Sequence, residues 1–168
     1  QPGPLTANTE EFNITSATVT AGAWASAPTL NTARYSVSST GTTTAALCVG
    51  GQPAPGYYNK TEEYNGSSWS EVTNYPLSAV TVGSTGPQTA AILFGGNTHP
   101  PSVDRTDSFT YDGSSFSSAP ALPVGRRGLS STGLGTQTAA LQSGGQTPSN
   151  SQTNSAEYDG SSWTAGNA

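Results

Sequence analysis

Few side chains in this 168-residue chain could do chemistry, and their spacing suits neither metal binding nor acid–base catalysis. His99 is the only histidine, so a copper or zinc site would lack the nitrogen ligands that these metals need. Glu62 and Glu63 are neighbours in a predicted strand and point to opposite faces, which argues against a working carboxylate pair. We therefore expect no enzymatic activity, no cofactor and no metal.

The remaining candidate nucleophile is also better explained by structure. Cys48 is the single cysteine and lies in the apolar run TAALCVGG, where we expect a buried, inert thiol. A triad-type site would have to use His99, which lies in the proline-rich stretch NTHPPSVDR. A histidine in such a loop is expected to be a solvated residue rather than a base.

Ligand recognition is a stronger hypothesis than catalysis. Three stretches that follow paired glycines differ most between the internal repeats of the chain, namely QPAPGYYNK (52–60), NTHPPSVDR (97–105) and QTPSNSQTN (146–154). Loops on a rigid scaffold are where recognition concentrates. The residues in them that could stack on or hydrogen-bond to a sugar or a protein are Tyr57, Tyr58, His99, Asp104 and Arg105. The alternative is that these are solvated loops of a purely structural protein.

An internal repeat of about 47 residues would position these loops. Paired glycines recur with spacings of 45 and 49 residues, at Gly50-Gly51, Gly95-Gly96 and Gly144-Gly145. Each pair is followed by a tyrosine, a turn and a second aromatic, in EEYNGSSWS (62–70), TYDGSSFSS (110–118) and AEYDGSSWT (156–164). A diverged fourth copy, EEFNITSATVTAGAWA, occupies 10–25.

Each repeat predicts four short strands. The first covers 34–41, 79–86 and 127–133; the second is the apolar run before the glycines, expected to be buried on both faces. The third ends at the tyrosine and the fourth starts at the next aromatic. Asn-Gly or Asp-Gly between them favours the positive φ angles of a tight hairpin turn. The hairpin would pair Tyr64 with Trp69, and we expect such rings to fill the space between neighbouring sheets rather than to bind ligand.

Paired glycines, a tyrosine 13 to 15 residues later and an aromatic five beyond it make a pattern that resembles the kelch repeat, from about Thr9 to the end. The matching residues are Gly50-Gly51, Tyr64 and Trp69; Gly95-Gly96, Tyr111 and Phe116; and Gly144-Gly145, Tyr158 and Trp163. Arg34 and Arg126 lie where kelch units often carry an arginine, but Ala79 occupies that position in the middle unit. The amino-acid sequences of the repeats are also similar to kelch-like arrays in proteins of marine phages and environmental bacteria.

The resemblance implies an all-β, kelch-like β-propeller in a single domain spanning 1–168. It would contain a half blade at 9–28 and full blades at 31–76, 77–120 and 121–168, about three and a half four-stranded blades. An unclosed propeller leaves edge strands exposed, so we expect closure by further repeats or by oligomerisation.

Composition narrows the partners. The chain has only five Lys and Arg residues and a net charge of −5, which argues against a nucleic-acid partner. It also lacks an apolar run of 18 residues, so we expect no membrane insertion. With 32% hydrophobic residues and 20 glycines, a Thr-rich β protein with a thin core is expected. No signal peptide is visible, and a chain without an initial Met is expected to be processed or excised.

These features favour a non-enzymatic structural and recognition module outside cells. The setting we expect is a phage virion appendage, such as a tail fibre, or an extracellular surface protein. Its partners would be copies of itself, other virion or surface proteins, or glycans. The alternatives are a secreted, lectin-like propeller that binds carbohydrate and a non-catalytic part of a larger glycan-active enzyme.

Overall fold

A computed structural model describes residues 26–53, 55–129 and 134–166, and the structural statements below concern these residues. They form an all-β fold of four antiparallel sheets with no helix. Accordingly, no helix in the described ranges is long and apolar enough to cross a membrane. Most of the half blade predicted at 9–28 lies outside the described residues.

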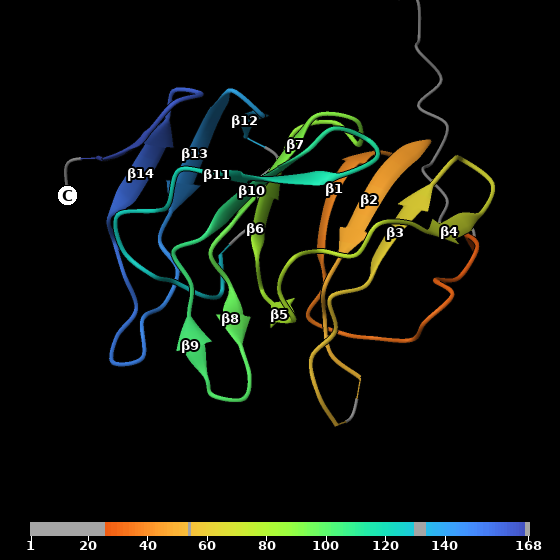
Figure 1. The fold of residues 1–168 in the computed structure, drawn as a ribbon, viewed down its shortest axis with the longest axis horizontal. Helices are drawn as coiled ribbons and strands as arrows, with labels where there is room; N and C mark the ends of the chain where they lie inside the picture. The colour runs from red at the N-terminus through yellow and green to blue at the C-terminus, as the bar shows by residue number, and fades with distance from the viewer. Residues whose placement is uncertain (1–25, 54, 130–133, 167–168) are drawn as a thin grey trace, which may run out of the picture.

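Three of the sheets have four strands each, and each is built from one sequence repeat (Figure 1). The first sheet contains β1 (Ser38–Thr42), β2 (Ala45–Val49), β3 (Thr61–Tyr64) and β4 (Trp69–Glu71). The second contains β6 (Gly83–Thr85), β7 (Ala91–Phe94), β10 (Ser108–Tyr111) and β11 (Phe116–Ala119). The third contains β12 (Gly135–Thr136), β13 (Ala139–Ser143), β14 (Ser155–Tyr158) and β15 (Trp163–Ala165). One four-stranded sheet per repeat is therefore a confirmed prediction.

The first predicted strand of each repeat is interrupted, which corrects the continuous strands expected over 34–41 and 79–86. The interruption falls at equivalent residues with positive φ, namely Ser36 (54°), Thr81 (52°) and Gly128 (62°). Before the break the chain pairs with residues just after the paired glycines. In the second repeat this gives a fourth, small sheet of β5 (Ala79–Val80), β8 (Asn97–Thr98) and β9 (Val103–Asp104). Residues 130–133, the end of the third predicted strand, lie outside the described part.

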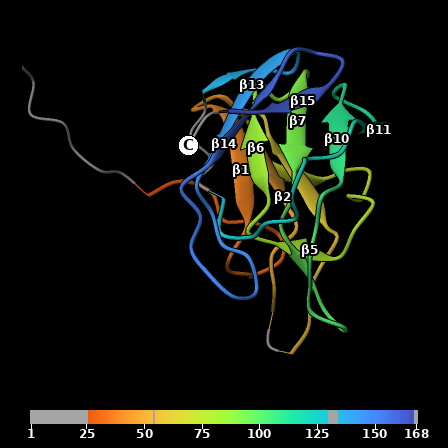
Figure 2. The ribbon, with the colours of Figure 1, turned by 90° about the vertical axis from the view of Figure 1, so that its left-hand side faces the viewer.

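Two buried clusters fill the space between successive sheets. Leu47 and Val49 of the first sheet pack with Leu93 and Tyr111 of the second. The opposite face of β7 carries Ile92 and Phe94, which pack with third-sheet side chains that include Trp163. Alternate residues of one strand thus serve two interfaces. The second sheet consequently lies between the first and the third, as both Figure 1 and Figure 2 show.

Burial of the apolar strand on both faces depends on this position. All four residues of β7 are buried, as predicted. In β13, however, Ala139 and Ser143 are exposed, because the described residues place a sheet on only one side of it. The prediction of two-sided burial is therefore wrong for the third repeat.

The paired glycines connect one sheet to the next. Gly50 and Gly51 have φ values of 65° and 94°, a conformation that disfavours residues with a Cβ. The Gly50 amide donates to the carbonyl of Lys60, the residue before β3 of the same repeat (2.9 Å), and the Gly51 amide donates to the Ala79 carbonyl in the next repeat (3.0 Å). The second glycine pair repeats this arrangement, with Gly96 donating to Arg126 (2.7 Å).

The repeated hairpin pairs its two aromatics as predicted. Tyr64 lies opposite Trp69 with ring centroids 5.1 Å apart, and the equivalent pairs are separated by 4.6 and 5.0 Å. The turn differs from the expected tight form, because the glycine has a positive φ (92° at Gly66) and the preceding Asn65 does not. Instead, Asn65 Oδ1 accepts the amides of Ser67 and Ser68, both at 2.9 Å, which caps a longer turn.

The paired rings fill the space between sheets in two of the three repeats. Tyr111 is buried in the first core cluster, with the partly buried Phe116 packed against that cluster, and Tyr158 and Trp163 are buried in the second. Tyr64, on the outer side of the first sheet, is only half-buried. The predicted packing role is thus confirmed where a neighbouring sheet is present.

Candidate functional site

The three divergent loops lie together at one end of the molecule. Figure 1 shows the β8–β9 hairpin beside the loop that follows β2 and the loop that follows β13, all at the lower edge. The arrangement follows from the repeat, since each loop leaves its sheet just after the paired glycines. The predicted recognition residues are therefore carried by one end of a rigid scaffold.

A hollow of about 360 Å³ lies between the loops of the first and second repeats. Its lining includes Tyr35, Gln52, Pro53, Pro55, Tyr57 and His99. The rings of Tyr57 and His99 are 5.6 Å apart and tilted by 46°. Tyr35 is 56% exposed and reaches the hollow because its backbone pairs with Gln52. The result is an open surface of aromatic rings and prolines.

A partly buried polar network holds one wall of the hollow. The Tyr57 hydroxyl lies 3.4 Å from Asn97 Oδ1, to which it donates, and Asn97 Nδ2 donates to Asp104 Oδ1 at 2.7 Å. Arg127 of the third repeat also donates to Asp104 Oδ1, at 3.2 Å. Asn97 is buried and the Asp104 side chain is only 3% exposed. Side chains from all three repeats thus fix the position of one aromatic ring.

The five predicted site residues separate into three groups. Tyr57 and His99 line the hollow, and Asp104 supports it through Asn97. Arg105 pairs with Asp107 at 2.7 Å and takes no part in the lining. Tyr58 is half-buried, and its amide bonds to Gly51. The structure therefore brings together three of the five.

Sequence reasoning missed three contributors, Tyr35, Asn97 and Arg127. Tyr35 and Arg127 lie in segments predicted as first strands, and the break after Tyr35 gives no sequence signal. Asn97 falls inside the divergent stretch 97–105 but looks like an ordinary turn residue. The pairing of Tyr35 with Gln52, and of Asn97 with Asp104, could be found only from strand register.

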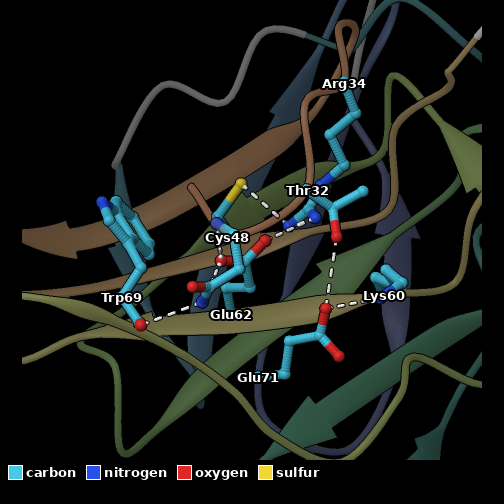
Figure 3. A network of polar contacts seen from close by, with 8 residues as sticks. Thr32, Arg34, Cys48, Lys60, Glu62, Trp69 and Glu71 are labelled. Carbon is cyan, nitrogen blue, oxygen red and sulfur yellow. Dashed lines mark hydrogen bonds and ion pairs between the residues drawn. The ribbon is translucent and has the colours of Figure 1, made fainter. Parts of the chain in front are cut away.

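A second polar cluster is centred on Arg34 and Glu62 of the first repeat (Figure 3). Arg34 NH1 and Glu62 Oε1 are 2.6 Å apart, and both side chains are fully buried. Asn31 donates to Glu62 Oε2 from its backbone and its side chain, at 2.8 and 3.0 Å. Burial raises the pKa of the adjacent Cys48 thiol, although the Arg34 charge opposes this effect. The cluster is structural, since Glu62 is bound by both Arg34 and Asn31, although the buried Arg34 Nε has no hydrogen-bond partner. Cys48 is buried, as predicted.

The chemistry available at the hollow is stacking and hydrogen bonding. Among the described residues there is no group of three or more His, Cys, Asp or Glu side chains that could hold a metal ion. Aromatic rings with polar edges bind ligands that are apolar on one face and polar at the rim. No family model matches the chain, and no curated protein matches it either.

Proposed function

We propose that this chain is a non-enzymatic structural and recognition module of kelch-like propeller architecture. Each four-stranded sheet would be one blade, and the divergent loops would form the recognition end. The repeat period, the glycine pairs and the packing of one sheet against the next support this proposal.

The ligand that best suits the recognition end is a sugar ring of a glycan. The observation that carries this choice is the open hollow lined by Tyr35, Tyr57 and His99, in which the last two rings are in contact. A pyranose has a C–H face that can lie on an aromatic ring and hydroxyl groups at its edge. Gln52 and the hydroxyls of the two tyrosines could bond those edges.

The setting we propose is extracellular, on a virion appendage or a cell surface. The similarity of the repeats to kelch-like phage arrays supports it, as does the low content of charged side chains, 9%. The partners would be neighbouring surface proteins or further sheets of this repeat type, joined through the open ends of the sheet stack.

A glycan array followed by calorimetry tests the ligand. We expect submillimolar binding to at least one glycan and, since a stacked ring contributes roughly 1–2 kcal/mol, an about five- to thirtyfold loss in Y57A. Y58A is the matched control, because the neighbouring tyrosine lies outside the hollow lining and should bind as the wild type does.

Two results would contradict the assignment. Silence of the wild-type protein across a broad array would favour a purely structural role. Equal losses in Y57A and Y58A would mean that the loop as a whole, rather than this hollow, contacts the ligand. Circular dichroism of each variant separates lost binding from lost folding.

A further inference from the structure

The third sheet has an open hollow of about 420 Å³ on the side away from the second sheet. Leu134 and residues 139–141 line it together with Glu157 and Tyr158. Leu134 is 54% exposed. In the first and second sheets the equivalent face is covered by the following sheet, so the same chain shows what such a face accepts.

A glutamine joins each covered face to the sheet that covers it. Gln88 Nε2 donates to the carbonyls of Ala46 (2.9 Å) and Tyr64 (3.0 Å) in the first sheet. Gln137, which occupies the same repeat position, donates to the equivalent two carbonyls of the second sheet at 3.1 and 2.9 Å. One side chain thus bridges two strands of the neighbouring sheet.

The third sheet presents the same pair of acceptors. Ala140 and Tyr158 are the equivalents of the bridged residues, they lie opposite each other in the sheet, and both line the hollow. No glutamine of the described residues donates to their carbonyl oxygens. The spacing that a bridging glutamine needs is therefore already present.

Two further contacts of a covered face have their counterparts here. Glu63 Oε1 accepts the hydroxyl of Tyr111 from the second sheet at 2.9 Å, and the equivalent of Glu63 is Glu157, which is exposed. Leu47 is 0% exposed beneath the second sheet, whereas its equivalent Leu141 is only half-buried. A carboxylate and an apolar side chain thus lie uncovered where the first sheet has covered ones.

The second glycine of each pair also shows that the third sheet lacks a contact that the other sheets make. Gly51 and Gly96 each donate an amide to a carbonyl of the next repeat, at 3.0 and 2.7 Å. Gly145 has the same left-handed conformation, with φ of 89°. Within the described ranges its amide has no backbone acceptor.

From these repeated contacts we propose that the outward face of the third sheet is a docking surface for one more sheet of this repeat, one that carries a glutamine at the position of Gln88 and Gln137. Its glutamine bonds the Ala140 and Tyr158 carbonyls, and its first-strand carbonyl accepts from Gly145. The inference rests on the structural half of the proposed function and is independent of the loop ligand.

The first sheet of a second copy fits this surface less well. Thr43 stands where the other repeats have glutamine, and its side chain is too short to bridge two strands. Glu62 stands where the second sheet has Phe109, which packs into the first core cluster. Glu62 is moreover already bound by Arg34 and Asn31 (Figure 3). A glutamine-bearing sheet is therefore the occupant that the contacts specify.

Extended chains test the proposal. Three separate chains each carry one extra repeat after Ala168, in a register that continues the existing repeats. A copy of residues 75–119 or of residues 122–168 supplies a sheet with the bridging glutamine. A copy of residues 30–74 supplies a sheet without this glutamine. Each is made in an L141C background. The labelling rate of the thiol in L141C falls when a sheet covers this face, and the buried thiol of Cys48 is the internal reference.

We expect both glutamine-bearing extensions to slow labelling of the L141C thiol at least tenfold, and the 30–74 extension to leave it near the unextended rate. Replacing the appended copy of Gln88 by alanine should restore labelling about tenfold, since two hydrogen bonds are lost. The same change at the appended copy of exposed Thr89 should have no effect.

Three results would overturn the proposal. Unprotected thiol in both glutamine-bearing chains would show that the face does not accept such a sheet. Equal protection by the 30–74 extension, or no effect of the glutamine substitution, would show that glutamine does not specify the occupant. Glycan binding, measured on the same chains, stays unaffected in each case and so tests the loop site separately.

Discussion

Arg34 and Glu62 form an ion pair of 2.6 Å whose two side chains are both 0% exposed (Figure 3). At the equivalent positions of the second repeat stand Ala79 and Phe109, both buried. One repeat thus fills this space with paired charges and the next with apolar groups. Equivalent positions are therefore occupied by an ion pair in one repeat and by two apolar residues in the next. In the ion pair, each charge needs the other as its partner.

Breaking this pair is expected to destabilise the protein strongly. R34A leaves a buried carboxylate without its cation, and E62A leaves a buried guanidinium, so each should lower the free energy of unfolding by about 3–5 kcal/mol. The double variant R34A/E62F copies the second repeat and should lose less than R34A alone. Urea denaturation of the wild type, R34A, E62F and R34A/E62F completes a double-mutant cycle, and strictly additive losses would show that the two side chains are not coupled.

The glycine pairs provide a matched test of packing between sheets. Gly95 and Gly144 have nearly equal φ, 65° and 62°, so alanine costs each about 1–2 kcal/mol of backbone strain. A Cβ on Gly95 would also lie 2.6 Å from Leu129 Cδ1 of the third repeat, whereas on Gly144 it would meet nothing closer than 3.5 Å. We expect G95A to be at least about 1 kcal/mol less stable than G144A in urea denaturation. Equal losses would contradict the described contact.

The glutamine bridge can be tested in the chain itself. Q137A removes two hydrogen bonds to the second sheet and should lower the free energy of unfolding by about 1–3 kcal/mol. Q146A is the control, because that glutamine is exposed and its side chain has a single contact, at 3.5 Å, with Arg127. A loss in Q137A no larger than in Q146A would indicate that the bridge does not hold the sheets together.

The hairpin turns should make stability dependent on acid pH. Hydrogen bonds from the side chain and amide of Ser161, and from the Ser162 amide, lower the pKa of Asp159 from 3.8 to about 2. Because the folded pKa is the lower one, this stabilisation is complete above about pH 4 and is lost as the pH falls to about 2. D159N introduces the residue type that Asn65 already supplies at the equivalent turn of the first repeat. This variant should therefore keep the turn and show a smaller fall in Tm between pH 4 and 2. An unchanged pH profile would refute the effect.

The all-β class and the four-stranded sheet of each repeat could be predicted from the sequence. Alternation, the glycine pairs and the Asp-Gly or Asn-Gly turns act within a few residues, so strands and hairpins follow from local chemistry. The breaks at Ser36 and Thr81 could not be predicted, because serine and threonine gain nothing locally from a positive φ. The break depends instead on the pairing that the chain makes beyond it.

The candidate site shows the same division. His99 and Tyr57 were found because divergent stretches of a repeat carry recognition, but Tyr58 could not be told from Tyr57 by sequence. Only the fold puts one beside His99 and the other outside the hollow lining. The role of Asn97 could not be predicted for the same reason, since Asn97 lies in the second repeat and holds Tyr57 of the first.

The sequence by itself determined the period, the four strands of each main sheet and the aromatic hairpins, because each depends on residues close together in the chain. Tertiary structure decided which faces are covered, since that depends on which sheet lies next to which. Tyr111 and Tyr64 occupy the same repeat position, yet Tyr111 is buried between two sheets and Tyr64 is half-buried at the outer side of one. Burial comes from a neighbour about 47 residues away, and a local pattern carries no information about whether that neighbour is there.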